Sequence, residues 1–254
     1  MAAVTELAVL VPVLNRPGNV ASLVESFLTG CPEDSILLFI SNVEEDDPDE
    51  ARALHQIWLN GNHRNESSRI WWRPQNVATT WPEKINYGAK WITADFSDQH
   101  GWGPAWFLLA ADDITFTPGW WEATKELRDD PSIGVIGTND STTGHGNPRV
   151  AAGEHTCHPL VRASYVRDRG TIDEPGKAVH DKFHHWFVDN ELVWTARLRG
   201  AWAFCRDAMI EHHHPYWDSS IPWDDTYALG EKHNQEDAEL WRDRATRLLG
   251  LQLQ

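Results

Sequence analysis

Five short apolar runs, each followed by a segment long enough for a helix, constrain the fold of this chain more than any other feature. The runs are residues 7–14, 36–41, 70–72, 106–110 and 133–137. A strand that is apolar throughout has to be covered on both faces, which is typical of parallel sheets packed between helices. The pattern therefore predicts an α/β fold with a central, mostly parallel sheet flanked by helices.

Helix signals occupy the segments between these runs. Pro17 precedes an apolar stripe that ends at Leu28, and Thr80 and Glu83 have the spacing of a capping box. Prolines at the first helical turn also mark helices that open at Asp47-Pro48 and Thr117-Pro118. Helices are further expected over residues 189–199 and in an amphipathic segment around residues 238–249. The sequence contains no internal repeat and no low-complexity linker, so we expect a single domain over residues 1–254.

The charge and the cysteine content limit the classes of binding partner and the cell compartment that suit this chain. The net charge of −16 disfavours broad, non-specific contact with nucleic acid or anionic membranes. Residues 142–210 nevertheless carry 9 Lys and Arg against 8 Asp and Glu, so this segment is compatible with a local basic groove.

No apolar run approaches the roughly 20 residues of a transmembrane segment. The N-terminal apolar run lacks a basic start, which favours a strand over a signal peptide. Three widely spaced cysteines favour a reducing compartment, and we expect a cytoplasmic protein.

Polar residues follow four of the five apolar runs. They are Asn15-Arg16, residues 42–47, residues 73–76 and Asp112-Asp113. Ligands of open α/β sheets bind beyond the carboxyl ends of the strands. The sequence therefore predicts a binding site at this edge of the sheet.

Asp112 and Asp113 are the first candidates for chemistry at that edge. Two adjacent carboxylates repel each other, and a divalent cation relieves the repulsion. Oxygen ligands favour magnesium or manganese. The alternative interpretation is a polar turn that precedes a helix.

Three segments in order resemble the GT-A fold of family 2 glycosyltransferases. They read LAVLVPVLNRP, ILLFISN and WFLLAADDITFTPGWW. Members of that family begin with a strand that ends in Asn-Arg-Pro, and they carry an Asp-rich motif after the fourth strand, followed by Pro-Gly-Trp. RPQNVATTWPEKINYG resembles the segment that precedes the Asp motif. The resemblance covers residues 7–215.

The resemblance implies a nucleoside-diphosphate-sugar donor held by residues 1–140. Asp112 would face the ribose, and Asp113 would hold Mn²⁺ or Mg²⁺ at the diphosphate, where the ion neutralises the leaving group. The family's acidic residue after the second strand corresponds to Asn42 and Glu44. The other expected donor-binding residues are Pro12, Leu14, Asn15, Arg16, Asn76 and Lys84.

Residues 141–254 would then form the acceptor side and a C-terminal helix. FVDNELVWTARLRG resembles the family's helix start with its catalytic carboxylate. The resemblance implies that Asp189 is the general base of an inverting transfer, with Glu191 as a second catalytic candidate. The alternative is that both residues merely favour a helix N-terminus electrostatically.

MIEHHHPYW offers further metal ligands late in the chain. GT-A enzymes often supply a histidine there, which implies His212 and His214. These two alternate on an expected strand and share a face, whereas His213 points away. The alternative is a packed or solvated histidine. Acceptor or sugar contacts are expected from His155, His158, Trp186, Trp217 and Trp223, or else these side chains serve packing.

The expected activity is metal-dependent glycosyl transfer to an acceptor hydroxyl. Four classes of acceptor are compatible with the sequence: a glycan, a lipid-linked sugar, a protein side chain and a modified nucleic-acid base. One alternative is a sugar nucleotidyltransferase, which would normally carry a Gly-rich phosphate loop that VLNRPGNV does not match. Another is a non-catalytic carbohydrate-binding protein, which would not need the carboxylates and histidines together.

Overall fold

The computed structural model describes most of the chain. The described ranges are 6–43, 48–62, 69–97, 103–140 and 146–251, without the side chains of residues 57–62, 95 and 96. Of the expected site residues, Glu44 lies outside the described residues.

The eight strands of the described residues form a continuous sheet in the order β3-β2-β1-β4-β7-β6-β8-β5. The first four in that order run parallel, whereas β7 is antiparallel to β4 and β6, and β5 is antiparallel to β8. β6 and β8 are parallel. The strands are β1 (Leu7–Pro12), β2 (Ile36–Ser41), β3 (Ile70–Pro74), β4 (Trp106–Leu109), β5 (Ile114–Phe116), β6 (Val135–Asn139), β7 (Leu160–Arg162) and β8 (Trp202–His212). The expected α/β fold around a mostly parallel central sheet is therefore confirmed.

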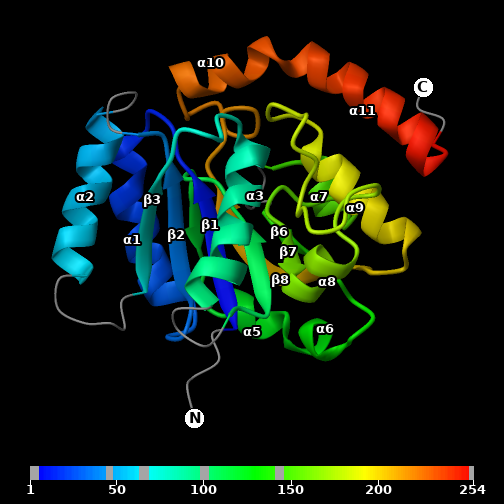
Figure 1. Ribbon diagram of the computed structural model, residues 1–254, viewed down its shortest axis with the longest axis horizontal. Helices are drawn as coiled ribbons and strands as arrows, with labels where there is room; N and C mark the ends of the chain where they lie inside the picture. Colours follow the sequence, from blue (N-terminus) through cyan, green and yellow to red (C-terminus); the bar gives the residue numbers. More distant parts are fainter. Residues whose placement is uncertain (1–5, 44–47, 63–68, 98–102, 141–145, 252–254) are drawn as a thin grey trace.

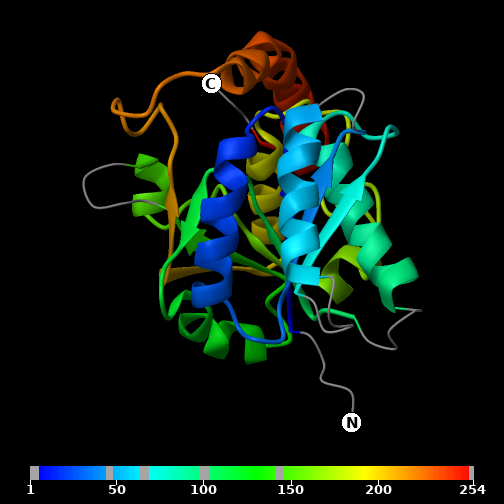
Figure 2. The same cartoon turned by 90° about the vertical axis from the view of Figure 1, so that its left-hand side faces the viewer.

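Helices cover both faces of this sheet (Figure 1). One face packs against α1, α2 and α5, and Figure 2 shows α1 and α2 lying side by side there. The other face packs against α3, α8 and α9, and α11 packs in turn against α9. The helices are α1 (Pro17–Gly30), α2 (Pro48–Asn62), α3 (Trp81–Trp91), η1 (Ile92–Phe96), α5 (Trp120–Ala123), α6 (Lys125–Asp129), α7 (Pro148–Ala151), α8 (Ala163–Asp168), α9 (Val188–Leu198), α10 (Asp225–Lys232) and α11 (Asn234–Leu249).

Several expected boundaries shift for local reasons. The helix expected at Pro118 begins at Trp120, because Gly119 adopts a positive φ of 84° immediately before it. The fifth apolar run gives a strand that starts two residues later than expected, at Val135. Leu28, expected to face the core, is 47% exposed, whereas Val20, Leu23 and Phe27 are fully buried. The short strand β5 was not expected at all.

α10 and α11 cross the carboxyl edge of the sheet, at the top of Figure 1. The hydroxyl of Thr226 in α10 donates a hydrogen bond to the backbone oxygen of Leu14, directly after β1. The C-terminal helices are therefore part of the region where the sequence predicts a site. No helix among the described residues is long and apolar enough to cross a membrane.

Arg244 fixes α11 to the rest of the fold. Its guanidinium is buried and lies 2.6 Å from Oε2 of Glu191 in α9. It also donates two hydrogen bonds to the carboxylate of Asp173. These contacts raise the pKa of Arg244 despite the opposing effect of burial. Glu191, only 2% exposed, has no other charged partner among the residues that the structure describes.

Replacing Arg244 with Met is expected to lower the free energy of unfolding by about 3–5 kcal/mol, because the buried carboxylate of Glu191 loses its counter-charge. Arg247→Met is the matched control on the same helix, since Arg247 pairs with Asp243 in an exposed ion pair worth at most about 1 kcal/mol. Urea denaturation of the two variants measures the difference. Equal losses of stability would contradict this role of Arg244.

Candidate functional site

Asp112 and Asp113 lie buried in the turn between β4 and β5, at the carboxyl edge of the sheet. The antiparallel pairing of β5 with β8 aligns Ile114 with His212, which brings the end of β8 beside Asp113. The antiparallel pairing of β4 with β7 places the start of β7, and His158 just before it, at the same point. Three separate segments of the chain thus meet around one carboxylate.

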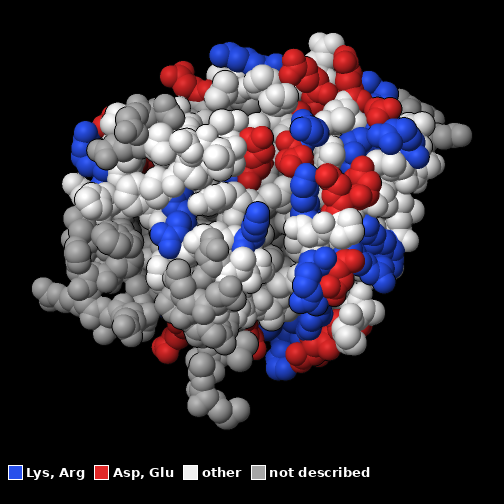
Figure 3. All heavy atoms as spheres, viewed as in Figure 1, with Lys and Arg blue, Asp and Glu red and all other residues white. Residues whose placement is uncertain are grey.

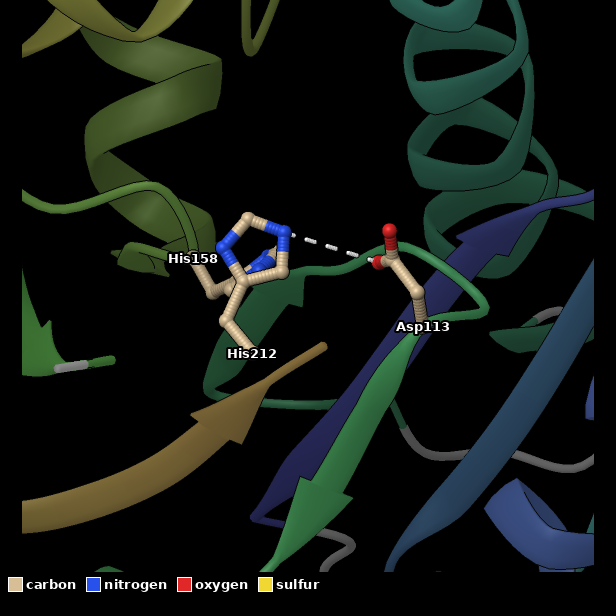
Figure 4. Close-up of side chains that lie close together, drawn as sticks. All are labelled: Asp113, His158 and His212. Atoms are coloured by element: carbon tan, nitrogen blue, oxygen red, sulfur yellow. Dashed lines mark ion pairs between the residues drawn. The ribbon is translucent and has the colours of Figure 1, made fainter. Parts of the chain in front are cut away.

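Asp113, His158 and His212 form a compact cluster, which we call the Asp113 cluster (Figure 4). One donor atom from each residue lies within 4.8 Å of the other two. Nε2 of His212 is 3.7 Å from Oδ1 of Asp113, and the rings of His158 and His212 meet edge to face with centroids 4.6 Å apart. A carboxylate and two imidazoles at this spacing are donors that suit a divalent metal ion.

Several buried polar atoms of this region have no hydrogen-bond partner among the described residues. They are Oδ2 of Asp112, Oδ1 of Asp113, Nδ1 of His212 and both ring nitrogens of His158. Buried polar atoms are otherwise nearly always satisfied, because an unmet hydrogen bond costs about 1–3 kcal/mol. Their concentration in one buried region, with one donor atom each of Asp113, His158 and His212 close together, therefore fits a site that holds a cation.

The ionisation of the cluster follows from burial and charge. Burial and the charge of Asp113 raise the pKa of Asp112 well above its usual value. Burial also acts on Asp113, but the neighbouring His212 outweighs it and holds the pKa of Asp113 below its usual value. Burial and the proximity of His212 lower the pKa of His158 to about 4, so His158 is neutral at pH 7. The cluster therefore combines an anionic carboxylate, Asp113, with a neutral imidazole, His158.

Arg16 supplies the positive charge nearest to the acidic pair. Its Nη1 lies 3.2 Å from Oδ1 of Asp112 and 3.5 Å from Oδ2 of Asp113. The same guanidinium donates hydrogen bonds to both carboxylate oxygens of Asp224 and lies 3.7 Å from the centre of the Tyr227 ring. The Tyr227 hydroxyl is 2.8 Å from Oδ2 of Asp113. The N-terminus of α10 and the loop after β1 are thus joined through Arg16.

The loop after β1 is held from several sides. Pro12 ends the strand in a buried position, and Asn15 has a positive φ of 56°. The backbone N–H of Arg16 donates a 2.6 Å hydrogen bond to Glu50, a buried carboxylate of α2. Below the loop, the buried ammonium of Lys84 donates to the backbone oxygen of Val13. Lys84 therefore supports the loop from inside the protein.

Asn42 and Asn76 follow the two neighbouring strands β2 and β3 at the same edge. Asn42 is half-buried, and Asn76 is exposed. The loop that carries Asn76 is fixed by the buried side chain of Gln75, which accepts hydrogen bonds from the backbone N–H groups of Val77 and Ala78. Both asparagines lie beyond the carboxyl ends of parallel strands, where the sequence places donor-binding residues.

Asp189 lies in the first turn of α9, next to the Asp113 cluster. Its Oδ2 is 3.0 Å from Nε2 of the buried His155, and its side chain is 26% exposed. Cys157 connects the two sites, because its Sγ lies within 4.8 Å of donor atoms of both Asp189 and His212. Burial would raise the pKa of Asp189, but His155 and the Asn190 N–H hold it below its usual value. Asp189 is thus ionised and within reach of solvent.

Glu191 has a different environment, although it is only two residues further along. Arg244 approaches both of its oxygens, at 2.6 and 2.9 Å, inside the protein. The structure places Glu191 in the packing between α9 and α11, away from solvent.

His214 and the expected tryptophans lie on the other side of His212. The rings of His212 and His214 are 5.2 Å apart, whereas His213 is exposed and bonds to Thr115. Nδ1 of His214 accepts a hydrogen bond from the backbone N–H of Tyr216, and its ring stacks on the Tyr216 ring. Around them lie Tyr227, Trp186, Trp217 and Trp223.

Several residues of this site were not expected from the sequence in the roles that the structure gives them. His158 was expected at the acceptor or the sugar, and Glu50, Asp140, Cys157, Asp224 and Tyr227 were not expected. Asp140 directly follows β6 and accepts a hydrogen bond from the backbone N–H of Cys157. Its place after an apolar strand was the same signal that singled out Asp112. The other residues come together only through strand pairing and the path of α10.

Comparison with known proteins gives structural neighbours only. No protein-family model matches the sequence, and no curated protein does. The mannosyltransferase PcManGT from Pyrobaculum calidifontis, solved with GDP-Man and Mn²⁺, has a TM-score of 0.63 at 10% identity, covering 95% of this chain and 66% of that one. S. aureus TarS 1-349 has a TM-score of 0.58 at 11% identity, covering 81% of this chain and 59% of that one.

A third neighbour is the glucosyl-3-phosphoglycerate synthase from Mycobacterium tuberculosis, solved with Mg²⁺ and UDP. Its TM-score is 0.51 at 10% identity, with 98% of this chain and 81% of that chain covered. The chain thus spans less than two thirds of TarS 1-349 and PcManGT. These neighbours share one architecture with the sheet and helices described above, and the chain has the GT-A fold of glycosyltransferases.

Proposed function

We propose that this protein is a glycosyltransferase that moves a sugar from a nucleoside-diphosphate sugar to an acceptor hydroxyl and needs a divalent cation. The observation that carries the proposal is the Asp113 cluster, which brings a carboxylate and two imidazoles together at the carboxyl edge of a GT-A sheet, with buried polar atoms that have no partner among the described residues. The solved neighbours that contain GDP-Man with Mn²⁺, or UDP with Mg²⁺, support the same chemistry.

The donor set favours manganese over magnesium. Asp113 offers an oxygen, but His158 and His212 offer nitrogens, which magnesium binds less readily than transition metals do. We propose that these three residues hold the ion and that His214 supports His212 from the aromatic side. The ion would offset the negative charge that develops on the departing diphosphate.

The donor would occupy the edge formed by the loops after β1, β2 and β3. Arg16 and Asn15 lie in the first of these loops, and Asn42 and Asn76 follow the other two strands. Arg16 lies within 3.5 Å of both aspartates, so its charge is available to a diphosphate bound beside Asp113. We propose Asp112 as the ribose contact, because its Oδ2 is buried without a partner among the described residues.

Asp189 is the proposed general base of an inverting transfer. Its ionised carboxylate would accept the proton of the acceptor hydroxyl while the hydroxyl oxygen bonds to the anomeric carbon and the bond to the diphosphate breaks. His155 and the Asn190 N–H orient the carboxylate by one hydrogen bond to each oxygen. Glu191, paired with the buried Arg244, is better suited to hold α9 and α11 together.

The acceptor is proposed to be a sugar-containing molecule. Tyr216 and Trp223 are 46% and 48% exposed beside His214, and exposed aromatic faces suit the apolar faces of sugar rings. On the face seen in Figure 3, many Lys and Arg side chains lie beside Asp and Glu. Arg167 and Lys177 are examples of surface cations in ion pairs. Such a mixed surface favours a glycan or a lipid-linked sugar over a nucleic acid.

The three unpaired cysteines fit a reducing compartment, and we propose the cytoplasm.

His212→Gln is expected to weaken Mn²⁺ binding by at least about 10- to 100-fold. Loss of a residue that only orients a metal ligand already weakens metal binding by this factor, and His212 is proposed to be a ligand itself. His213→Gln is the matched control, because its ring is exposed and bonds to Thr115. Calorimetric titration with Mn²⁺, Mg²⁺ and Fe²⁺ measures both the affinity and the ion preference. Equal Mn²⁺ affinities in the two variants would refute the ligand assignment.

Asp113→Ala is expected to abolish the metal-dependent part of nucleoside-diphosphate binding and to leave the fold intact, because removal of one buried carboxylate relieves the repulsion from Asp112. Thermal stabilisation by UDP or GDP, measured with and without Mn²⁺, reports the loss. A variant that is stabilised as much as the wild type would rule out Asp113 as the metal carboxylate.

Asp189→Asn is expected to reduce kcat by about 100-fold or more while donor binding changes little, because the amide keeps the size of the side chain and loses its basicity. Asp243→Asn, at an exposed carboxylate of α11, is the control. Activity is measured with a panel of sugar nucleotides and saccharide acceptors. Near-normal turnover in Asp189→Asn, or a product with retained anomeric configuration, would be incompatible with this mechanism.

A further inference from the structure

A second group of histidines lies where α10 joins α11, and the proposed reaction does not use it. His233 connects the two helices, and its ring stacks on that of His184 with centroids 4.0 Å apart and an angle of 10° between the planes. His184 belongs to the loop that leads into α9. Glu236 and Asp237, in the first turn of α11, complete the group.

The donor atoms of this group lie close together. Nδ1 of His233 lies 3.0 Å from Oε2 of Glu236, and Nδ1 of His184 lies 3.9 Å from the same oxygen. Nδ1 of His184 is also 3.2 Å from Oδ1 of Asp237. Zinc bonds of about 2.0–2.2 Å in a tetrahedron separate the ligand atoms by roughly 3.4 Å. All three separations are close to this value.

We propose that His184, His233 and Glu236 form a zinc site, with an oxygen of Asp237 as the fourth donor. Two imidazoles and two carboxylates are ligands that zinc accepts in tetrahedral sites. The two negative charges match the charge of the ion. Hard ions such as Mg²⁺ prefer sites made of oxygen alone, so the pair of imidazoles selects a transition metal.

The side chains have the freedom that metal binding requires. The parallel rings have to tilt, because each imidazole must direct its lone pair at the same ion. The side chains of His184 and His233 are 38% and 35% exposed, so both rings border on solvent and can tilt towards it. Asp237, by contrast, is 1% exposed and accepts hydrogen bonds from the backbone N–H groups of residues 184–186. The site thus combines an anchored oxygen donor with two partly exposed rings.

The position of the site gives the ion a structural role. α10 carries Tyr227, which contacts Asp113 and Arg16, and the loop of residues 184–186 continues into α9 with Asp189. Trp186 already joins this loop to α10, because its indole N–H donates to the backbone oxygen of Gly230. A zinc ion at His184 and His233 would lock these two segments together beside the Asp113 cluster.

The experiment measures zinc binding by the full chain in a background without the Asp113 cluster. The variant Asp113→Asn/His212→Gln removes two of the proposed ligands in the Asp113 cluster, so the remaining zinc binding is assigned separately from the proposed function. In this background, one equivalent of zinc is expected to bind and raise Tm. Adding His184→Asn and His233→Asn is expected to weaken zinc binding by at least about tenfold and to abolish the rise in Tm.

Two further variants keep the test decisive. His55→Gln, in α2 on another part of the surface, controls for the loss of any exposed histidine and is expected to change nothing. If the histidine variant fails to fold, Glu236→Gln removes one ligand at a position that is 66% exposed, and the same loss of zinc affinity is expected. Unchanged zinc affinity and unchanged stabilisation in either ligand variant would overturn the proposal.

Discussion

The site is organised around two adjacent carboxylates that are buried together. Asp112 and Asp113 repel each other and lose the solvation of water, so their positions are stable only when positive charge and hydrogen-bond donors surround them. Arg16 comes from the loop after β1, His212 from the end of β8, and Tyr227 from α10. Segments from both ends of the chain therefore converge on one turn of the sheet.

The sequence predicted the framework of this site because strand ends and helix starts are local features. Apolar runs located β1, β2 and β4, and the polar residues after them located Arg16 and the aspartates without any knowledge of the sheet order. His158 and Tyr227 could not be placed in the same way. His158 reaches Asp113 only because β7 is antiparallel to β4, and Tyr227 does so only because α10 folds back over β1. Such long-range pairings leave no periodic signal in the sequence.

Asp189 and Glu191 show how a helix separates two similar residues. Two positions along a helix turn the side chain by roughly 200°, so neighbouring carboxylates face opposite directions. Asp189 faces His155 and solvent, whereas Glu191 faces Arg244 in the interior. The resemblance to the family motif implied a catalytic role for both residues. The spacing of the motif contains no information on Arg244, which lies 53 positions further along the chain.

Arg16 lies next to the position that a cation at Asp113 would occupy, so its positive charge would act strongly on that cation. Its guanidinium is 3.5 Å from the carboxylate of Asp113, and its bond to Asp224 ties it to α10. A divalent ion at Asp113 would repel this charge, which would weaken the binding of an ion that enters alone. A diphosphate that arrives with the ion would give the guanidinium a new anionic partner. Ion and diphosphate would then each strengthen the binding of the other, so the proposed site would discriminate against free metal and favour the assembled pair.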